Sequence, residues 1–474
     1  MGHREAQDTP RRVFGVAPEE ELLYSLSPDG SRRRIHPLVS RGRFLRLRRA
    51  LAWVLMAAFF GLPHLPVGGR PALLLDWGAR RFHVFGTTFH ATDTLLLLAF
   101  GAGIIVTIFF VASTVGRMWC GYLCPQLIWL EFLFRPLEAL LEGPPSRRRL
   151  LDRAPWGPVK ILRRGLKGLL FTAAALAMAV TFFAYFVPRG ELLAALGDPA
   201  GPGRTLALAV AGLTALITFD VLSFRDQMCT VACPYGRLQN VLADRDTVIV
   251  SYDPGRGEPR RKGPRAEGEA AGDCVDCGRC VATCPTGMDI RRGLQMECVG
   301  CAQCIDACDD VMDRLRRPRG LIRYTSQRAL EGGRSRVWRP RLAAYLVLFA
   351  AAWGALVWVA ATRAEARVEI LRTGRESYRL LPGGEVANQQ RLRITNHLPE
   401  PQAFTVDLTA PEGASLVVAI SPMRVGPDAV ETVDLVARVP AAAFRRGRVD
   451  GRYRIRSDRG FDQEHDVVLL GPWQ

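Results

Sequence analysis

Cysteine is missing from the final part of this 474-residue chain, since all twelve cysteines lie between residues 120 and 308. No histidine occurs between residues 274 and 308, and the chain carries neither a C-x-x-C-H haem-attachment motif nor a flavin-attachment motif. The first 49 residues contain no apolar h-region, so we expect no secretory signal peptide. The cysteines recur at ligand spacings, which argues against a scattered disulfide framework.

The net charge is +17 at pH 7, and 49% of the residues are hydrophobic. A basic chain can bind nucleic acid, but here the Lys- and Arg-rich runs flank long apolar stretches. That arrangement is typical of membrane topology signals. The pattern therefore favours a membrane protein, and we expect the lipid bilayer rather than nucleic acid as its environment.

Five apolar stretches are close to the ~20 residues that a helix needs to cross a bilayer core. Their length and scarcity of charge argue against buried helices of a soluble protein. The fourth stretch is the weakest, because Asp220 lies near its end. The predicted transmembrane helices are residues 47–64, 94–113, 168–186, 205–222 and 342–361.

Lys and Arg are abundant in residues 1–50, 115–167 and 223–341 but sparse in the 65–91 and 187–204 loops. The positive-inside rule then assigns the basic segments to the cytoplasm of a bacterial inner membrane. With five spans, the C-terminal tail lies in the periplasm. Residues 126–143 have amphipathic helical spacing, which predicts either a helix along the inner membrane surface or ordinary packing between spans.

The strongest motif is a doubled cysteine run. Residues 273–287 read DCVDCGRCVATCPTG, with the spacing C-x2-C-x2-C-x3-C-P, and a second run with the same spacing follows. The first three cysteines of each run can hold one cubane, whereas the fourth reaches the other cluster. This predicts two [4Fe–4S] clusters, the first on Cys274, Cys277, Cys280 and Cys308, and the second on Cys284, Cys298, Cys301 and Cys304.

Zinc knuckles are the alternative for these eight cysteines. Zinc sites rarely repeat this spacing, and no histidine lies among the cysteines. One position departs from the usual pattern, because Cys308 is followed by Asp309 where proline is usual. We expect this residue to change backbone hydrogen bonding near the first cluster without removing a ligand.

The other four cysteines form two C-x3-C-P motifs, one in RMWCGYLCPQ and one in RDQMCTVACPYG. Each motif follows an even-numbered span, so both emerge on the same face of the membrane. Proline at the end of each motif either breaks a helix or starts a new one. The two motifs indicate an internal repeat, whose candidate ligands are Cys120, Cys124, Cys229 and Cys233, with Met118 and Met228 as possible additions.

Three kinds of chemistry suit this set of sulfur ligands. Cys and Met select Cu(I), so the site could bind and reduce copper. A dithiol/disulfide relay and an additional metal centre are the other two. Cysteines packed at a helix end are the structural alternative. Because the pair is duplicated on the face that carries the clusters, we favour a functional site.

The tail alternates apolar and polar residues, as strands do. Seven short strands separated by turn residues predict a small antiparallel sandwich of the immunoglobulin type. The tail has no cysteine and no cluster of titratable residues, which suggests a role in docking to a partner or in stiffening the outer side. The predicted strands are residues 366–372, 391–398, 402–408, 415–420, 430–439, 448–457 and 462–470.

The predicted fold is thus a multi-domain membrane protein. It combines an α-helical bundle of about five spans, a bacterial two-cluster ferredoxin-like α+β module and an all-β immunoglobulin-like sandwich. Residues 253–272 are rich in Pro, Gly and charge and read as a linker. The domains are a basic N-terminal segment (1–46), a membrane domain (47–252), the linker (253–272), the ferredoxin-like domain (273–341), the fifth helix (342–361) and the sandwich (365–474).

These features together resemble the cytochrome c oxidase accessory protein family known as CcoG, FixG or RdxA. The two C-x3-C-P pairs, the double ferredoxin run, VMDRLRRPRGLIRYTS (residues 311–326) and the final sandwich carry the resemblance, which covers nearly the whole chain. The C-x3-C-P pairs alone also occur in membrane polyferredoxins of the NapH and NosR type. The order of all the parts is more specific.

The resemblance implies reduction of Cu(II) to Cu(I) for assembly of a cbb-type haem–copper oxidase, with copper as substrate or bound ion. It also implies a cytoplasmic electron donor, and oxidase assembly factors or copper transporters as partners. One alternative is an electron conduit to another membrane or periplasmic redox enzyme. Another is a non-redox scaffold or copper chaperone.

Overall fold

The structure is a computed structural model that describes residues 34–473 apart from 69, 80, 91–93, 262–271, 294, 296, 337, 363, 374–376 and 399. Its residues divide into two compact units. The first unit lies within residues 1–78 and 94–356, and the second within residues 79–93 and 357–474.

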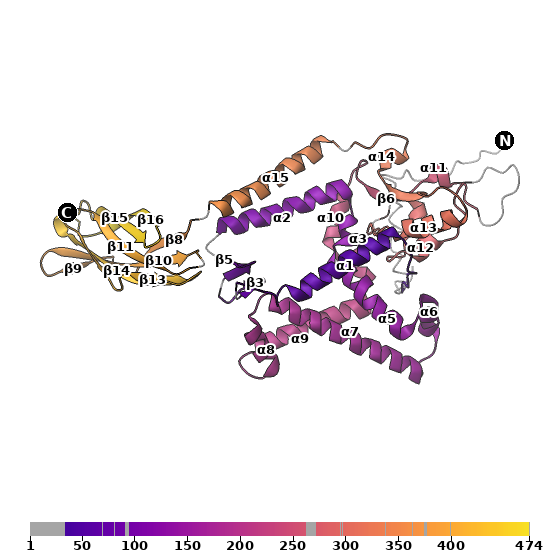
Figure 1. The fold of residues 1–474 in the computed structure, drawn as a ribbon, viewed down its shortest axis with the longest axis horizontal. Helices are drawn as coiled ribbons and strands as arrows, with labels where there is room; N and C mark the ends of the chain where they lie inside the picture. Colours follow the sequence, from indigo (N-terminus) through magenta and orange to yellow (C-terminus); the bar gives the residue numbers. More distant parts are fainter. Residues whose placement is uncertain are drawn as a thin grey trace, which may run out of the picture. The chain divides into compact units, whose positions relative to one another are not determined.

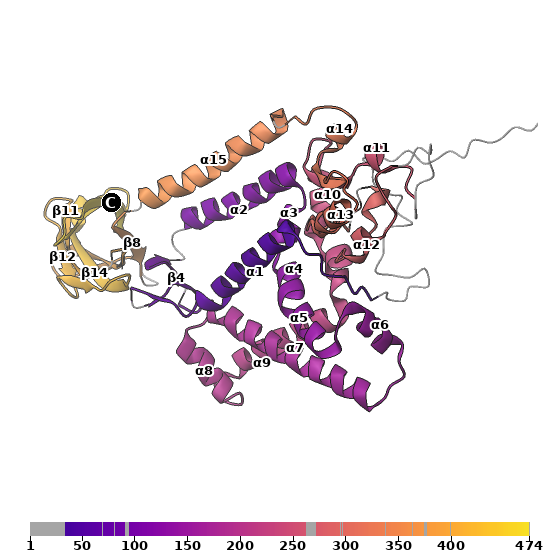
Figure 2. The same cartoon turned by 45° about the vertical axis from the view of Figure 1, so that its right-hand side comes forward.

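In the part of the chain that the structure describes, four helices are long and apolar enough to cross a membrane, and they coincide with the second to fifth predicted spans (Figure 1). Within the first unit, α2 and the first part of α15 lie side by side (Figure 2). The rings of Phe110 and Phe349 stack between them, with centroids 5.4 Å apart. The helices are α2 (Thr94–Val115), α7 (Pro158–Ala184), α9 (Arg204–Phe219), which continues into the π-helical turn η4 (Asp220–Phe224), and α15 (Pro340–Ala361).

The first predicted span corresponds to helix α1 (Arg43–Gly61). This helix is not among the four that meet both criteria of length and apolar composition. Its first turns carry Arg43, Arg46, Arg48 and Arg49, so the apolar part is shorter than the helix. The crossing by α1 stays a prediction.

Helix α7 begins ten residues before the predicted start at 168. The sequence prediction stopped at the charged residues that precede the apolar run. Lys160 and Lys167 are nevertheless buried in the helix, because Lys167 Nζ lies 2.7 Å from Glu142 Oε1 and Lys160 Nζ donates to the carbonyl of Ala154 at 2.5 Å. Buried cations of this kind need such partners.

The amphipathic segment 126–143 is a helical run made of α4 (Pro125–Trp129), the π turn η3 (Leu130–Phe134) and α5 (Arg135–Glu142). Glu138 and Glu142 on this run are almost fully buried, and Phe134 packs edge-on against Phe171 of α7 at 5.0 Å. Packing between helices is therefore the alternative that the structure supports. The neighbouring short helices are α3 (Met118–Tyr122), α6 (Pro145–Arg153), α8 (Arg189–Gly197), η5 (Met228–Ala232) and α10 (Pro234–Leu242).

The ferredoxin-like part has the expected α+β composition. Strand β6 (Ile249–Tyr252) pairs antiparallel with β7 (Ile322–Thr325), and the strands pack on a buried core that includes Ile305 and Met312. Its helical segments are α11 (Pro254–Gly257), α12 (Arg279–Ala282), η6 (Ile290–Arg292), α13 (Gln303–Arg314) and α14 (Gln327–Leu330).

The linker prediction is wrong for residues 253–261. Asp253 caps a helical turn by accepting a hydrogen bond from the backbone of Arg256, and Arg256 Nε donates to Asp273 at 2.6 Å. These contacts fold the segment onto the ferredoxin-like module. Residues 262–271 of the predicted linker lie outside the described residues. Strand β6, which precedes the linker in the chain, also belongs to the module because it pairs with β7.

Helix α13 is bonded to the start of α1. The carboxylate of Asp306 accepts hydrogen bonds from the backbone nitrogens of Phe44 at 3.2 Å and Leu45 at 2.8 Å. A side-chain oxygen at this position satisfies donors that the first turn of a helix leaves free. The ferredoxin-like module and the membrane helices therefore belong to one compact unit.

The second unit contains the predicted sandwich. One sheet has the order β12–β14–β10–β8, with β9 also paired to β10, and the other has the order β13–β11–β15–β16. Their inner faces form one buried core, which includes Leu392, Leu435, Phe404 and Ile455. All seven predicted strands are present, and the structure adds two strands of three residues, β9 and β13, which are too short to show alternation.

The bounds of the sandwich strands are β8 (Ala366–Arg372), β9 (Arg379–Leu381), β10 (Glu385–Asn396), β11 (Gln402–Ala410), β12 (Ser415–Val418), β13 (Met423–Val425), β14 (Val430–Pro440), β15 (Arg448–Ser457) and β16 (Asp462–Leu470). Five short strands lie in the segment predicted as the first outer loop. They are β1 (Pro66–Val67), β2 (Arg70–Pro71), β3 (Leu73–Asp76), β4 (Arg81–Val84) and β5 (Thr87–His90).

Candidate redox and metal centre

The first predicted cysteine quartet lines one cavity. Cys274, Cys277, Cys280 and Cys308 surround it together with apolar residues of the module core. Three of these cysteines come from the first run, whereas Cys308 comes from helix α13 at the end of the second run. The structure thus brings together the four residues that the spacing assigns to one cluster.

The second quartet lines a separate cavity. Cys284, Cys298, Cys301 and Cys304 surround it, together with Cys280 of the neighbouring site. Cys284 is the fourth cysteine of the first run. Each run therefore contributes its fourth cysteine to the site formed by the other run. This arrangement is typical of two-cluster ferredoxins.

The residues present fit two cubanes better than single metal ions. Among the described residues, no three His, Cys, Asp or Glu side chains converge closely enough to hold one ion. A tetrahedral zinc site needs four ligands at about 2.3 Å from one ion, whereas the thiolates of a cubane each bind a different iron and stand further apart. Burial raises the pKa of the Cys280 and Cys301 thiols to about 12, so these thiols lose protons when a cluster binds.

Positive charge lies beside the first quartet. Arg291 lines the same cavity and is held by Asp289 and Asp276, with its Nη2 2.7 Å from Asp289 Oδ2. Asp309, which replaces the usual proline, accepts a hydrogen bond from the backbone nitrogen of Gly320 at 3.1 Å. This hydrogen bond joins the residue after Cys308 to the loop that follows α13. A proline at this position has no side-chain acceptor for it.

The two C-x3-C-P motifs share one local design. Cys124 is the N-cap of α4 and Cys233 is the N-cap of α10, and in both cases the following proline, Pro125 or Pro234, is the first helical residue. Proline suits this position because its fixed φ is helical and no backbone donor is lost. Of the two expected roles of the prolines, starting a new helix is the one observed. A thiolate here would face the positive end of a helix dipole.

The first cysteines of the two motifs are more enclosed. Burial raises the pKa of the Cys120 thiol to about 12 and that of Cys229 even further, and Cys120 also interacts electrostatically with Cys124 and Cys233. The four cysteines are therefore neighbours, but their side chains do not form a ready single-ion site. Met228 begins the π turn that carries Cys229 and is partly exposed, and Met118 begins the helix that carries Cys120.

Sequence reasoning missed Gln239 of α10, which completes the surroundings of Cys120. The Cys120 thiol donates a hydrogen bond to Gln239 Oε1 at 3.3 Å. Gln239 is 1% exposed, and its Nε2 has no hydrogen-bond partner among the described residues. An amide that can accept from a thiol or donate to a thiolate suits a site whose sulfur changes protonation state.

The first motif lies directly against the second cluster loop. A methyl group placed on Gly121 would lie 2.9 Å from the backbone nitrogen and Cα of Cys301. On the other side, Gly300 has φ +64° and approaches the backbone of Arg117 so closely that a Cβ would lie 2.9 Å from its carbonyl. Both positions require glycine. The backbone at Cys301 therefore touches the backbone at Gly121, the residue that follows Cys120.

Arg117 ties three segments together. Its Nη1 donates to the carbonyl oxygen of Cys298 at 3.1 Å, and its Nη2 donates to the carbonyl oxygen of Gly236, two residues after Pro234. The cluster loop and both C-x3-C-P motifs are therefore joined by one guanidinium. No motif in the sequence identified this residue.

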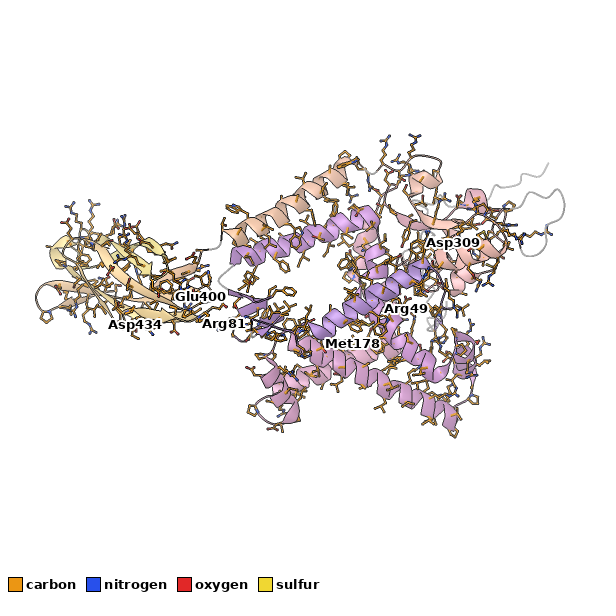
Figure 3. The ribbon with its side chains drawn as sticks, in the orientation of Figure 1. Arg49, Arg81, Met178, Asp309, Glu400 and Asp434 are labelled. Carbon is orange, nitrogen blue, oxygen red and sulfur yellow. The ribbon has the colours of Figure 1, made fainter. Side chains whose placement is uncertain are left out.

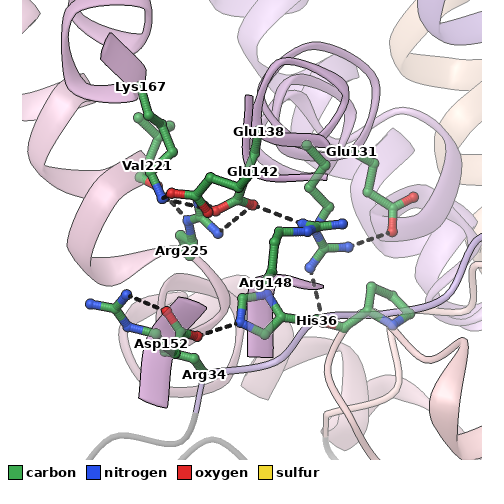
Figure 4. Close-up of polar contacts among 12 residues, drawn as sticks. Arg34, His36, Glu131, Glu138, Glu142, Arg148, Asp152, Lys167, Val221 and Arg225 are labelled. Carbon is green, nitrogen blue, oxygen red and sulfur yellow. Dashed lines mark hydrogen bonds and ion pairs between the residues drawn. The ribbon is translucent and has the colours of Figure 1, made fainter. Parts of the chain in front are cut away.

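A network of buried charges supports the same region (Figure 4). Glu138 Oε2 accepts from Arg148 and Arg225 at 3.1 Å each, and Glu138 Oε1 accepts from Lys167 at 3.2 Å. Burial acts to raise the pKa of Glu138, but Arg225, Lys167 and Arg148 outweigh it and hold the pKa well below the usual range. The charges join α5, α6, α7 and the segment that leads to the second motif.

A second carboxylate connects the helices to the cluster module. Glu131 lies 2.6 Å from Arg48 Nη2 and accepts two hydrogen bonds of 3.1 Å from the amide of Gln303. Gln303 lies between the predicted ligands Cys301 and Cys304. Single acidic residues within an amphipathic helix give no sequence signal for such a role.

Three family models match the chain. A 4Fe-4S dicluster domain matches residues 224–327, and a 4Fe-4S binding domain matches residues 94–147. An "IG-like fold at C-terminal of FixG" matches residues 356–472. The matches support iron–sulfur cofactors and the immunoglobulin-like tail, and the second one contains the first C-x3-C-P motif.

Curated relatives match over most of the chain. The nitrogen fixation protein FixG of Rhizobium meliloti is 31% identical over 82% of this chain and 81% of its own. Proteins RdxA and RdxB of Cereibacter sphaeroides are each 34% identical, over 77% and 93% of this chain and 81% and 96% of their own.

A crystal structure of a FixG-related protein from Vibrio parahaemolyticus covers 23% of this chain and 98% of its own, with 15% identity and a TM-score of 0.20. That score is too low to carry an argument. The curated relatives carry the assignment, because their identity extends over both iron–sulfur and tail regions. The chain belongs to the FixG/RdxA family of membrane iron–sulfur electron-transfer proteins.

Proposed function

We propose that this protein reduces Cu(II) to Cu(I) for the assembly of a cbb-type cytochrome c oxidase. The observation that carries the proposal is the contact between Gly121 and Cys301. It supports a redox pathway between the cluster module and the first C-x3-C-P motif, because the two backbones meet without an intervening side chain.

Two sets of cysteines have separate roles in the proposal. The eight cysteines at 274–308 hold two [4Fe–4S] clusters, which when bound would supply electrons one at a time. Iron–sulfur clusters in general span roughly −700 to +450 mV, and cupric reduction is downhill from the negative part of that range. Cys120, Cys124, Cys229 and Cys233 bind copper as the substrate. The soft sulfur ligands favour Cu(I) over Cu(II), which makes reduction more favourable.

The surroundings of the sulfur ligands suit a bound cation. Cys120 and Cys229 are partly buried thiols that lose protons when copper binds. Cys124 and Cys233 occupy the N-cap positions of α4 and α10. Because the four side chains do not converge on one point, copper binding includes a small rotation of at least one of them.

The topology and partners are part of the same proposal. The basic segments face the cytoplasm, where an electron donor reaches the cluster module, and the sandwich lies in the periplasm. Oxidase assembly factors or copper transporters exchange copper with the C-x3-C-P motifs. The sandwich then serves as a docking domain.

The test is anaerobic mixing of the reduced protein with Cu(II). The proposal predicts that the clusters are oxidised and that one Cu(I), detected with a Cu(I)-specific chelator, forms per electron. A variant with Cys120, Cys124, Cys229 and Cys233 all changed to Ser should keep its iron and lose the fast phase. Equal rates in both proteins would refute a role for the motifs, and no reaction in either would refute cupric reduction.

A further inference from the structure

A large cavity opens in the first unit, and it shares no lining residue with the two cavities that the cysteine quartets surround. Its volume is about 650 Å³, within the range of about 300–1,000 Å³ that is usual for ligand sites. Its walls come from the segment 37–39, from α1, from the η3–α5 run and from α6 and α13. Most of the lining is apolar.

Two helical rows form the walls. On α1, Leu45, Arg49 and Trp53 recur at intervals of four residues, and on the η3–α5 run Phe132, Pro136 and Leu140 do the same. Residues at this spacing share one face of a helix. Leu45 and Phe132 at one end of the rows belong to one buried cluster, whereas Trp53 and Leu140 at the other end are 58% and 78% exposed.

The mouth of the cavity is cationic. A second hollow shares Val39, Leu45 and Arg49 with the cavity and adds Arg41 and Arg46, so the two are continuous. Arg49 lies on α1 (Figure 3). Within the described part of the chain, Arg41, Arg46 and Arg49 are exposed and no carboxylate pairs with any of the three.

The polar floor of the cavity differs from its mouth. Glu131 accepts from Arg48, Arg135 and Gln303. The floor cations Arg48 and Arg135 are thus each paired with the Glu131 carboxylate. The unbalanced charge at the mouth is therefore the part of the cavity that selects a partner.

We infer that this cavity binds an anionic phospholipid, with its phosphate on Arg41, Arg46 and Arg49 and an acyl chain between the two helical rows. The apolar walls match the chain, and the three arginines complement the phosphate charge. Trp53 is placed one turn beyond Arg49, as interfacial tryptophans are placed relative to cationic anchors.

The bound lipid would touch a segment that is attached to the cluster module. The backbone nitrogen of Leu38 donates to the carbonyl of Ala282 at 2.8 Å, and Thr283 Oγ1 donates to the carbonyl of Leu38 at 2.8 Å. Ala282 and Thr283 lie just before the cluster ligand Cys284. The lipid site therefore connects the membrane surface to the first cysteine run.

Native mass spectrometry of the full-length protein, titrated with phosphatidylglycerol or phosphatidylcholine, tests this inference. About 1 kcal/mol per arginine corresponds to about fivefold in affinity, so three arginines give a preference for phosphatidylglycerol on the order of 100-fold. The variant R41Q/R46Q/R49Q should lose this preference. The matched control R149Q/R153Q changes exposed arginines of α6 that do not line the cavity, and it should keep the preference.

A second variant separates the chain site from the charge. Ala139 lines the cavity and is exposed, so A139W fills the space without changing an arginine. It should lower the number of retained lipids, with unchanged circular dichroism and iron content. Retention of the lipid preference in the triple arginine variant would overturn the inference. So would recovery of a quinone or a neutral lipid from the cavity in place of an anionic one.

Discussion

The guanidinium of Arg117 donates a 3.1 Å hydrogen bond to the carbonyl oxygen of Cys298. A residue three positions before Cys120 is thus bonded to a predicted ligand of the second cluster. The same side chain also reaches the backbone of Gly236 in the second motif. One side chain, which is not part of the C-x3-C-P spacing itself, therefore joins the cluster module to both motifs.

The substitution Arg117→Gln should slow electron transfer to copper by roughly 10- to 100-fold, because a small displacement at a reacting site has effects of this size. Stopped-flow absorbance of the reduced protein mixed with Cu(II) measures the rate. Arg314→Gln, an exposed position of the module, is the matched control and should leave the rate unchanged. A normal rate in R117Q with normal iron content would show that this bridge has no role in transfer.

Removing ligands from one quartet should remove one cluster. The double variant C274S/C277S is expected to contain about four irons per chain in place of about eight, since each cubane holds four. Iron and sulfide analysis with EPR measures this on anaerobically purified protein. The variant C120S/C124S should keep about eight. Loss of all iron from the first variant would instead mean that the two sites assemble cooperatively.

Glu138→Gln should destabilise the protein by about 3–5 kcal/mol, because it removes the carboxylate partner of buried Arg148 and Arg225 and leaves Lys167 with Glu142 alone. Thermal unfolding in detergent measures the change. Glu191→Gln, an exposed position on α8, should change stability by less than about 0.5 kcal/mol. An equal, small effect of both substitutions would contradict a supporting role for the network.

The same carboxylate predicts a pH dependence. The folded-state pKa of Glu138 is lowered, so its contribution is fully present above the unfolded pKa of about 4.3 and is lost as pH falls from there toward the folded value. The difference in melting temperature between wild type and E138Q should be constant from neutral to mildly alkaline pH and shrink below about pH 4. A difference that shrank with rising pH would have the wrong sign.

Gln239→Leu should weaken Cu(I) binding by about 10- to 100-fold, as loss of a residue that orients a metal ligand does. Leucine keeps the volume but removes the hydrogen bond to Cys120. Competition with a Cu(I) chelator measures the affinity. Gln227→Leu, just before the second motif, is the matched control and should bind normally. Rescue by Gln239→Asn but not by Leu would assign the effect to the amide.

Much of the fold could be predicted from the sequence because the signals are local. The x2 spacing of the cysteines assigned both quartets, and those quartets line two cavities. Alternation found seven sandwich strands, and apolar length found four helices. The tight geometry at Gly121 and Gly300 could not be predicted, because it depends on contacts between segments that are far apart in the chain.

The charged helices show the limit of composition as a guide. The charges of Lys160 and Lys167 made the predicted span start too late, at residue 168. Helix α7 begins at Pro158 and includes both lysines. Their partners Glu142 and Ala154 lie on other segments, and pairing across segments leaves no periodic trace in the sequence. Gln239, Arg117 and Glu131 were missed for the same reason.

The carboxylate of Glu138 also sets an order for biogenesis. Lys167 lies near the start of the helical hairpin formed by α7 and α9, and Arg225 follows its last turn, η4. The carboxylate of Glu138 forms an ion pair with both side chains. A lone charge in hydrocarbon is costly, so neither end can settle until α5 has arrived. We therefore expect the translocation machinery to release the hairpin together with the helix that precedes it, because a nascent chain stopped before Arg225 would leave Glu138 paired with Arg148 and Lys167 alone.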